Sequence, residues 1–165
     1  MNTPSIRIAA LQATPKPTFP ERSEQVYRAL EEADKQHIDF LCFPEGFLTG
    51  YYSDKNVARS SSFEIGDKDF QDWLTETQSF YVTAIIGFNE RKGEELYNSA
   101  AVVEKGQLLG VQRKHYIYHD YFTQSDRAFT YLPSQNDILQ KKLIQLIKCL
   151  RHRLLNSAFN GKGLI

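Results

Sequence analysis

An amphipathic segment between two short apolar runs constrains the fold of this chain more than any other feature. The apolar runs are residues 6–11 and 38–43, and both have the length and composition of buried strands. Between them, residues 21–36 place Val26 and Leu30 at helical spacing, with charged residues on the other faces. A strand, a helix and a second strand in this order predict a βαβ crossover, which makes the two strands parallel neighbours in one sheet.

The next part of the chain continues the alternation of helices and strands. We expect a helix over residues 68–80, a strand over 81–88 and a turn over 90–95. Two further strands, 96–103 and 108–112, are then joined by a hairpin whose turn contains a lysine–glycine pair. The resulting order of elements, βαβαβββ, predicts an α/β fold built on a mixed sheet.

The carboxy-terminal part of the chain has a different character. From Gln135 onward six basic residues stand against one acidic residue, although the whole chain carries 20 of each. Residues 138–155 combine leucines and isoleucines at helical spacing with basic residues, which predicts a basic amphipathic helix. We therefore divide the chain into a domain over residues 5–130 and an atypical basic helical tail over residues 131–165.

Composition narrows the classes of partner and compartment. The formal net charge of zero gives no indication of nucleic acid or an anionic membrane surface as a partner. No apolar stretch approaches the length needed to span a bilayer, and the first residues lack the pattern of a secretory signal. The two cysteines, Cys42 and Cys149, are too few for a disulfide framework, so a reducing, cytoplasmic setting is the better interpretation.

Two strand ends carry residues that could perform chemistry. Glu45 directly follows Pro44 after the second apolar run, and Lys114 stands between Arg113 and His115 after the last predicted strand. Open α/β sheets bind ligands at the carboxyl ends of their strands. There a carboxylate can act as a base, and a cation can stabilise developing negative charge. Taken singly, each residue is more often an ordinary solvated surface charge.

The surroundings of these two residues resemble the nitrilase, or carbon–nitrogen hydrolase, superfamily. Residues 6–12 resemble the opening strand of that family, and Phe43-Pro44-Glu45 with Gly50-Tyr51 resembles its first catalytic motif. Residues 96–103, then Gly106, then Arg113-Lys114-His115 resemble the segment that ends in the catalytic lysine. The resemblance covers residues 5 to about 128 and keeps the order and approximate spacing of the motifs.

The resemblance implies mixed-sheet layers like half of the family's four-layer αββα sandwich, and hydrolysis of a small amide or nitrile. In that family a cysteine attacks the substrate carbon and forms a thioester-type intermediate that water later hydrolyses. Carried over to this chain, Glu45 would take the thiol proton and later activate water. Lys114 would stabilise the negative charge of the tetrahedral intermediate. No cofactor and no metal ion is implied.

The family's cysteine motif, a strand pattern such as Gly-x-x-Ile-Cys-Tyr-Asp, does not occur in this sequence. Cys149 lies downstream of Lys114 at a distance that suits a nucleophile, but inside the amphipathic helical pattern, where a small apolar role is more frequent. Cys42, in the second apolar run, is expected to be a core thiol. We therefore expect a truncated and impaired hydrolase, and a shifted reading frame near residue 130 is our hypothesis for the tail.

Three functions stay open from the sequence. They are a hydrolase by ancestry without activity, an amidase that uses Cys149, and a non-catalytic α/β binding or interaction module in which the tail contacts a partner. His115, His119 and Asp120 follow the lysine, but adjacent ligands such as residues 119 and 120 do not converge on one metal ion. Asp120 could instead take the place of an additional acid found in some family members. An unpaired sheet edge would favour a homo-oligomer.

Overall fold

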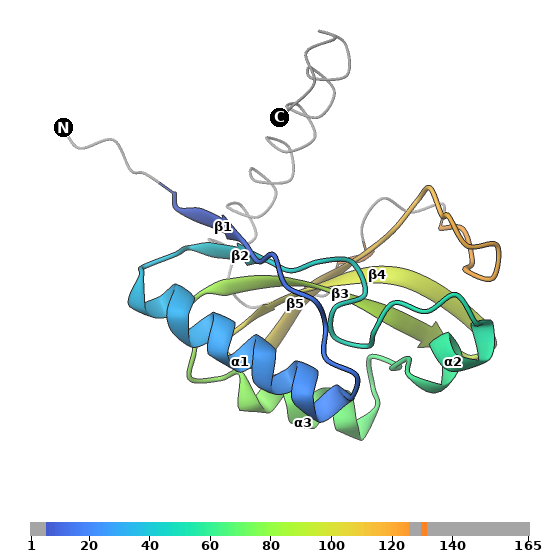
Figure 1. The fold of residues 1–165 in the computed structure, drawn as a ribbon, viewed down its shortest axis with the longest axis horizontal. Helices are drawn as coiled ribbons and strands as arrows, with labels where there is room; N and C mark the ends of the chain where they lie inside the picture. The colour runs from blue at the N-terminus through green and yellow to red at the C-terminus, as the bar shows by residue number, and fades with distance from the viewer. Residues whose placement is uncertain (1–5, 126–129, 132–165) are drawn as a thin grey trace, which may run out of the picture. The chain divides into compact units, whose positions relative to one another are not determined.

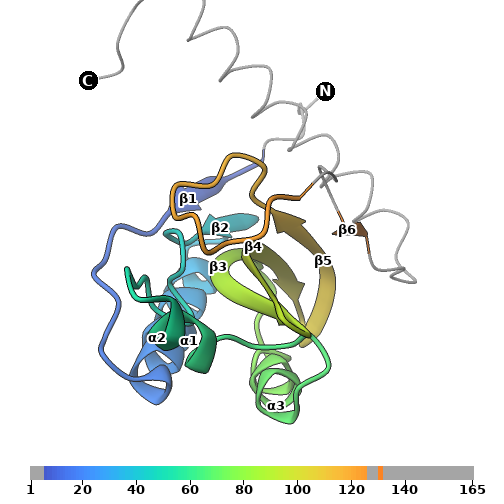
Figure 2. The same cartoon turned by 90° about the vertical axis from the view of Figure 1, so that its right-hand side faces the viewer.

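The computed structural model describes residues 6–125 and 130–131. Its strands form one sheet in the order β1-β2-β3-β4-β5-β6 (Figures 1 and 2). The strands β1, β2 and β3 are parallel to one another, whereas β3, β4, β5 and β6 are antiparallel. This arrangement confirms the predicted mixed sheet of an α/β fold. The strand bounds are Ile8–Ala10, Phe40–Cys42, Thr83–Lys92, Glu95–Glu104, Gln107–Arg113 and Thr130–Tyr131.

The predicted βαβ crossover is present at the start of the chain. Helix α1 (Phe19–Lys35) connects β1 to β2, and the register pairs Ile8 with Phe40. The helix begins at Thr18, whose side chain accepts a hydrogen bond from the Glu21 N–H while Glu21 reaches back to the Thr18 backbone. This reciprocal capping box satisfies backbone donors that the first helical turn leaves free, so the helix starts at a defined residue.

The first strand differs from the prediction in its exposure. We expected a buried strand over residues 6–11, but β1 spans only Ile8–Ala10, and Ile8 is 49% exposed. The strand pairs with β2 alone, because it lies at the end of the strand order. The apolar composition that marks a strand therefore did not distinguish an edge position from a central one.

Two helices cover one face of the sheet. Helix α1 and helix α3 (Lys68–Glu76) lie side by side on the same side of the strands (Figure 2). Phe70 of α3 stacks on Phe88 of β3 and on Trp73, with ring centroids 5.5 Å and 5.8 Å apart. The core between helices and sheet also contains Val26, Leu30, Leu41, Leu74, Ala84, Ile86, Ala101, Val103 and Val111. Burial of this apolar face orients the sheet, because alternate residues of each strand then point to the opposite side.

The hairpin between β4 and β5 has the predicted turn. Lys105 and Gly106 both have positive φ angles, 48° and 74°, as a two-residue turn of matching twist requires.

The sequence did not predict helix α2 (Lys55–Ser60), which begins at Asp54 and buries only Ala58. The predicted basic helix over residues 138–155 lies outside the described residues. Among the helices that are described, none is long and apolar enough to cross a membrane.

Candidate active site

The loop that carries Glu45 is docked on strand β3. After β2 the chain turns tightly, with Gly46 and Gly50 at φ 63° and 94°, and the Leu48 N–H donates to the Gly87 carbonyl at 3.0 Å. Gly87 permits this approach because it has no side chain. A Cβ there would lie 2.5 Å from the Gly46 nitrogen and 2.6 Å from the Pro44 carbonyl oxygen. The loop and β3 therefore fit together only with glycine at this position.

Hydrogen bonds from β3 and α1 hold the rest of this loop in place. Thr49 is fully buried, and its hydroxyl accepts a hydrogen bond of 2.8 Å from the Asn89 backbone N–H. The Asn89 side chain donates to the Gly50 carbonyl at 3.2 Å. Arg22 of α1, only 4% exposed, donates to the Leu48 carbonyl at 2.8 Å. Buried donors and acceptors are costly to leave unpaired, so these bonds hold the loop in one conformation.

Glu45 and Lys114 meet at the end of this loop. The Lys114 Nζ lies 3.0 Å from both carboxylate oxygens of Glu45, although the residues are 69 positions apart in the sequence. The Asn98 side chain donates to Glu45 Oε1 at 2.5 Å. Lys114 follows β5 directly, and its backbone N–H donates to the Asn98 carbonyl at 2.7 Å. Residues from three separate segments thus form one cluster of carboxylate, ammonium and amide.

The pair contributes little to folding stability. The side chains of Lys114 and Glu45 are 37% and 42% exposed, so water screens their attraction. An ion pair of this kind typically contributes about 0.2–1 kcal/mol. The pair is therefore better explained by what the groups can do to a bound molecule than by a structural role.

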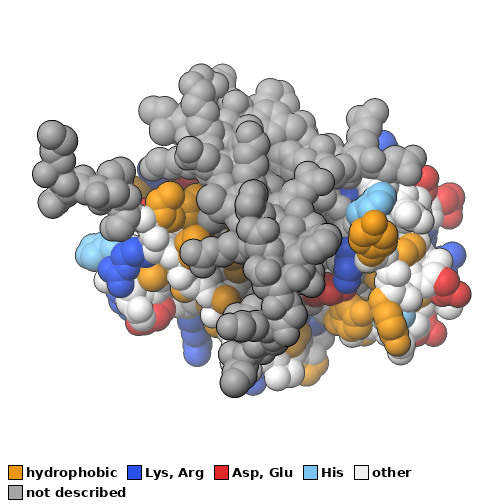
Figure 3. Space-filling model, turned by 90° about the horizontal axis from the view of Figure 1, so that it is seen from above, with side chains coloured by type: hydrophobic (Ala, Val, Ile, Leu, Met, Phe, Trp, Pro, Cys, Tyr) orange, Lys and Arg blue, Asp and Glu red, His pale blue; other side chains and the backbone are white. Residues whose placement is uncertain are grey.

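A cavity of about 250 Å³ adjoins the pair. It lies on the sheet face opposite α1 and α3, because its lining residues Ile85 and Gly87 alternate along β3 with the core residues Ala84 and Ile86. Figure 3 views the protein from this side of the sheet. Its floor combines apolar residues of β3 and β4, and Phe43 directly after β2, with polar groups that include Glu45, Asn98 and Lys114. The lining residues are Phe43, Glu45, Ile85, Gly87, Asn98, Ser99, Ala100, Gln112 and Lys114. A hollow with an apolar floor and a few convergent polar groups has the character of a small-molecule site.

Three basic residues lie at the end of β5 and directly after it, and they do not form a single cluster of cations. Arg113 forms an ion pair with Glu90, which is 2% exposed, and its guanidinium lies 3.8 Å from the centre of the Tyr97 ring. The Glu90 carboxylate raises the pKa of Arg113. The ring of His115 forms a hydrogen bond of 2.8 Å with the Ser125 carbonyl. Lys114 alone of the three contacts Glu45 in the described structure.

The other candidate residues do not belong to the acid–amine pair. The strand register places Cys42 beside Ile85, half-buried on the face that carries the cavity, and burial raises the pKa of its thiol. A raised pKa leaves less thiolate at neutral pH, which disfavours a nucleophile. Asp120 is exposed, and Cys149 lies outside the described residues. Within residues 6–125 and 130–131, no group of three or more His, Cys, Asp and Glu side chains could hold a metal ion.

Sequence reasoning did not single out Asn98. It lies in β4 between Tyr97 and Ser99, and it is buried, with 8% of its surface exposed. The signal was a run of polar residues inside an otherwise apolar strand. Buried amides need hydrogen-bond partners, so such a run predicts a partner across the sheet face. The sequence alone could not name Glu45 as that partner.

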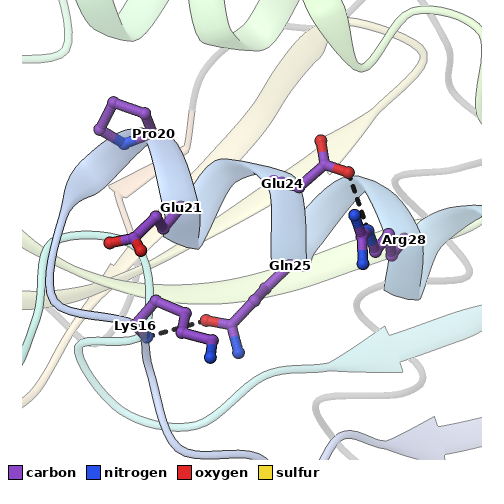
Figure 4. Close-up of a pocket in the computed structure, with 6 residues that line it drawn as sticks. All are labelled: Lys16, Pro20, Glu21, Glu24, Gln25 and Arg28. Atoms are coloured by element: carbon purple, nitrogen blue, oxygen red, sulfur yellow. Dashed lines mark hydrogen bonds and ion pairs between the residues drawn. The ribbon is translucent and has the colours of Figure 1, made fainter.

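A larger hollow of about 400 Å³ lies on the exposed side of α1 (Figure 4). Its polar side chains already bond to their neighbours: Gln25 accepts from the Lys16 N–H at 2.8 Å, and Arg28 pairs with Glu24 at 2.8 Å. Both bonds are exposed to water, and none of the residues that line this hollow is buried. This hollow is an ordinary helix surface and not a second active site.

The fold agrees with comparisons to known proteins. The family model of the carbon–nitrogen hydrolases matches residues 7–159, and the chain belongs to that family. It is 34% identical over 110 residues to the glutamine-dependent NAD(+) synthetase of Thermotoga maritima. These aligned residues make up 66% of this chain and 19% of the synthetase. It is 31% identical over 136 residues to the nitrilase of Pyrococcus abyssi, covering 75% and 50% respectively. The chain thus spans about half of the nitrilase and about a fifth of the synthetase.

Solved structures show the same fold. A double mutant of the amidase from Nesterenkonia sp. AN1, in complex with acrylamide, matches with a TM-score of 0.63 and 19% identity over 74% of this chain and 49% of that chain. A glutamine-dependent NAD+ synthetase from Acinetobacter baumannii, in complex with ADP, matches with a TM-score of 0.62 and 21% identity over 90% of this chain and 31% of that one. The mixed sheet with its helices is therefore the nitrilase-superfamily arrangement.

Proposed function

We propose that this chain carries the acid–amine part of a carbon–nitrogen hydrolase site of the amidase or nitrilase type, which acts on non-peptide bonds. The observation that carries the proposal is the contact of the Lys114 Nζ with both oxygens of Glu45, 3.0 Å each, beside a cavity of about 250 Å³. A base and a cation at this separation can both reach one reacting group.

The chemistry divides between the two residues. Glu45 accepts the proton of an attacking thiol or water and later returns it to the departing nitrogen. Lys114 stabilises the negative charge that develops on the substrate as the carbon becomes tetrahedral. An ammonium in a partly enclosed pocket does this more strongly than one in bulk water, because the effective dielectric constant is lower.

A nucleophile must complete the site. One mutant of the Nesterenkonia amidase shows the result of Michael addition of acrylamide at its active-site cysteine. The corresponding motif does not occur in these 165 residues, and Cys42 has a raised pKa. We therefore propose that hydrolysis by this chain alone is impaired, and that a cysteine-bearing segment from outside these residues is needed for turnover. The cytoplasmic setting, the lack of nucleic-acid and membrane partners, and self-association stay predictions from the sequence.

A comparison of the chain alone with a chimera tests the proposal. The chain alone is incubated with glutamine, acetamide and acetonitrile, and ammonia is measured before and after thiol alkylation. A chimera then joins residues 1–128 to the carboxy-terminal half of the Pyrococcus abyssi nitrilase. We expect ammonia release only from the chimera, and a loss of at least about a hundredfold in Glu45→Gln and Lys114→Met chimeras. Glu94→Gln, at an exposed surface ion pair with Arg59, is the matched control and should keep full activity.

Two results would overturn the proposal. The first is alkylation-sensitive ammonia release from the unmodified chain, which would assign catalysis to one of its own two cysteines. The second is a folded chimera whose activity survives Glu45→Gln. That result would leave the acid without a catalytic role.

A further inference from the structure

Asn98 contacts both members of the acid–amine pair at once. Its side-chain amide donates to Glu45 Oε1 at 2.5 Å, and its backbone carbonyl accepts the Lys114 N–H at 2.7 Å. The residue is buried in β4, which lies between β3, on which the Glu45 loop is docked, and β5, which precedes Lys114. A single residue of this strand therefore bonds the carboxylate directly and also holds the backbone from which the Lys114 side chain extends.

The same bonds distinguish the two oxygens of the carboxylate. Oε1 accepts from Asn98 and from Lys114, whereas Oε2 accepts from Lys114 alone in the described structure. A carboxylate oxygen offers two lone-pair sites in its plane. Oε1 is thus saturated, and Oε2 keeps one site open.

Another buried asparagine shows what a purely structural amide does here. The Asn89 side chain donates to the Gly50 backbone carbonyl at 3.2 Å, and it has no part in the acid–amine pair. Asn98 instead donates its side-chain hydrogen bond to the carboxylate of Glu45, which lines the cavity. Hydrogen bonds to charged groups are stronger than those to neutral groups, and they orient the acceptor.

We propose that Asn98 is a positioning residue that occupies Glu45 Oε1 and so makes Oε2 the atom that accepts the proton. The proposal rests on the proposed function and names the reacting atom within it. The proton leaves the S–H or O–H of the nucleophile and binds Oε2, so Glu45 becomes a neutral acid while Lys114 keeps its charge. The same proton then passes to the leaving nitrogen, which restores the carboxylate.

The test follows side-chain amide protons by NMR in the full chain and needs no turnover. Hydrogen exchange of the Asn98 and Asn89 amides is compared between the natural chain and Glu45→Ala. We expect exchange at Asn98 to rise about tenfold in the variant, because a charged acceptor is lost, while Asn89 is unchanged. The amide proton resonances of Asn98 should also move as acid protonates Glu45, and this movement should vanish in Glu45→Ala.

An Asn98 amide that does not bond to Glu45 would not follow the protonation of that carboxylate. Unchanged Asn98 exchange in Glu45→Ala, together with Asn98 resonances that ignore acidification, would overturn the proposal. If the exchange of the Asn89 amide also changes in Glu45→Ala, the movement of the Asn98 resonances on acidification of the natural chain decides the question alone, because that measurement involves no substitution. Because no hydrolysis is measured, a chimera whose activity survives Glu45→Gln would refute the proposed function without affecting the link between Asn98 and Glu45.

Discussion

The two halves of the candidate site are held in opposite ways. The loop that carries Glu45 is buried from Gly46 to Gly50 and is bonded to β3 and to α1. Residues 115–120, which follow Lys114, are largely exposed, with Tyr116 and Tyr118 at 82% and 85% of their full surface. Glu45 therefore belongs to a tightly packed part of the molecule, whereas Lys114 stands at the start of a segment that faces solvent. A site of this kind fixes the group that must align with a proton, and it leaves the charge on a flexible side chain.

The largest effect should follow from filling the space between the loop and β3. In Gly87→Ala, the new Cβ would lie 2.5 Å and 2.6 Å from backbone atoms, which cannot move as a side-chain tip can. We expect a loss of about 3 kcal/mol in the free energy of unfolding, measured by urea denaturation. Gly66→Ala is the matched control, because a Cβ there meets nothing within 4 Å. Equal stability of the two variants would mean that the loop is not docked on β3.

A smaller loss is expected when the buried cation beneath the loop is removed. Arg22 donates to the carbonyls of Leu48, Lys16 and Pro17 at 2.8–2.9 Å, and Arg22→Met leaves all three without this donor. We expect about 2 kcal/mol of destabilisation in the same urea experiment. Arg28→Met, which removes an exposed ion pair on the same helix, should be close to neutral. A neutral Arg22→Met would contradict the rigid anchoring of the loop.

The acid–amine pair should have a weaker effect on stability than either anchor. Lys114→Met removes an ion pair whose side chains are both more than a third exposed, so we expect a change below about 1 kcal/mol. The difference from the natural chain should shrink further in high salt, because counterions screen the pair. A loss as large as that of Arg22→Met would show that Lys114 is structural, which would remove the contrast between the two halves.

The exposed segment should tolerate substitution best. Tyr118→Ser replaces a ring that is 85% exposed, so the melting temperature should stay within about 1 °C of the natural value. Limited proteolysis should cut first after residue 114 and spare residues 44–50, since local opening favours exposed segments. Early cleavage inside the Glu45 loop would reverse the order of rigidity.

The sequence predicted regular elements better than contacts. The βαβ unit and the hairpin at Lys105 and Gly106 could be predicted, because apolar spacing and turn residues are local signals. Helix α2 could not, since it buries only Ala58 and offers no apolar stripe. Glu45 and Lys114 were placed at strand ends, but the close docking at Gly87 and the bond from Asn98 join residues more than 35 positions apart. Local pattern carries no information on such pairs.

The most direct test of the site is a zero-length cross-link. A carbodiimide joins a carboxylate to an amine only where the two groups are in contact, and mass spectrometry identifies the joined peptides. We expect a Glu45–Lys114 amide in the natural chain and none in Glu45→Gln, with Glu31–Lys35, an exposed pair at 2.8 Å, as the internal control. A sample that cross-links Glu31 to Lys35 and leaves Glu45 and Lys114 unjoined would contradict a shared acid–amine site.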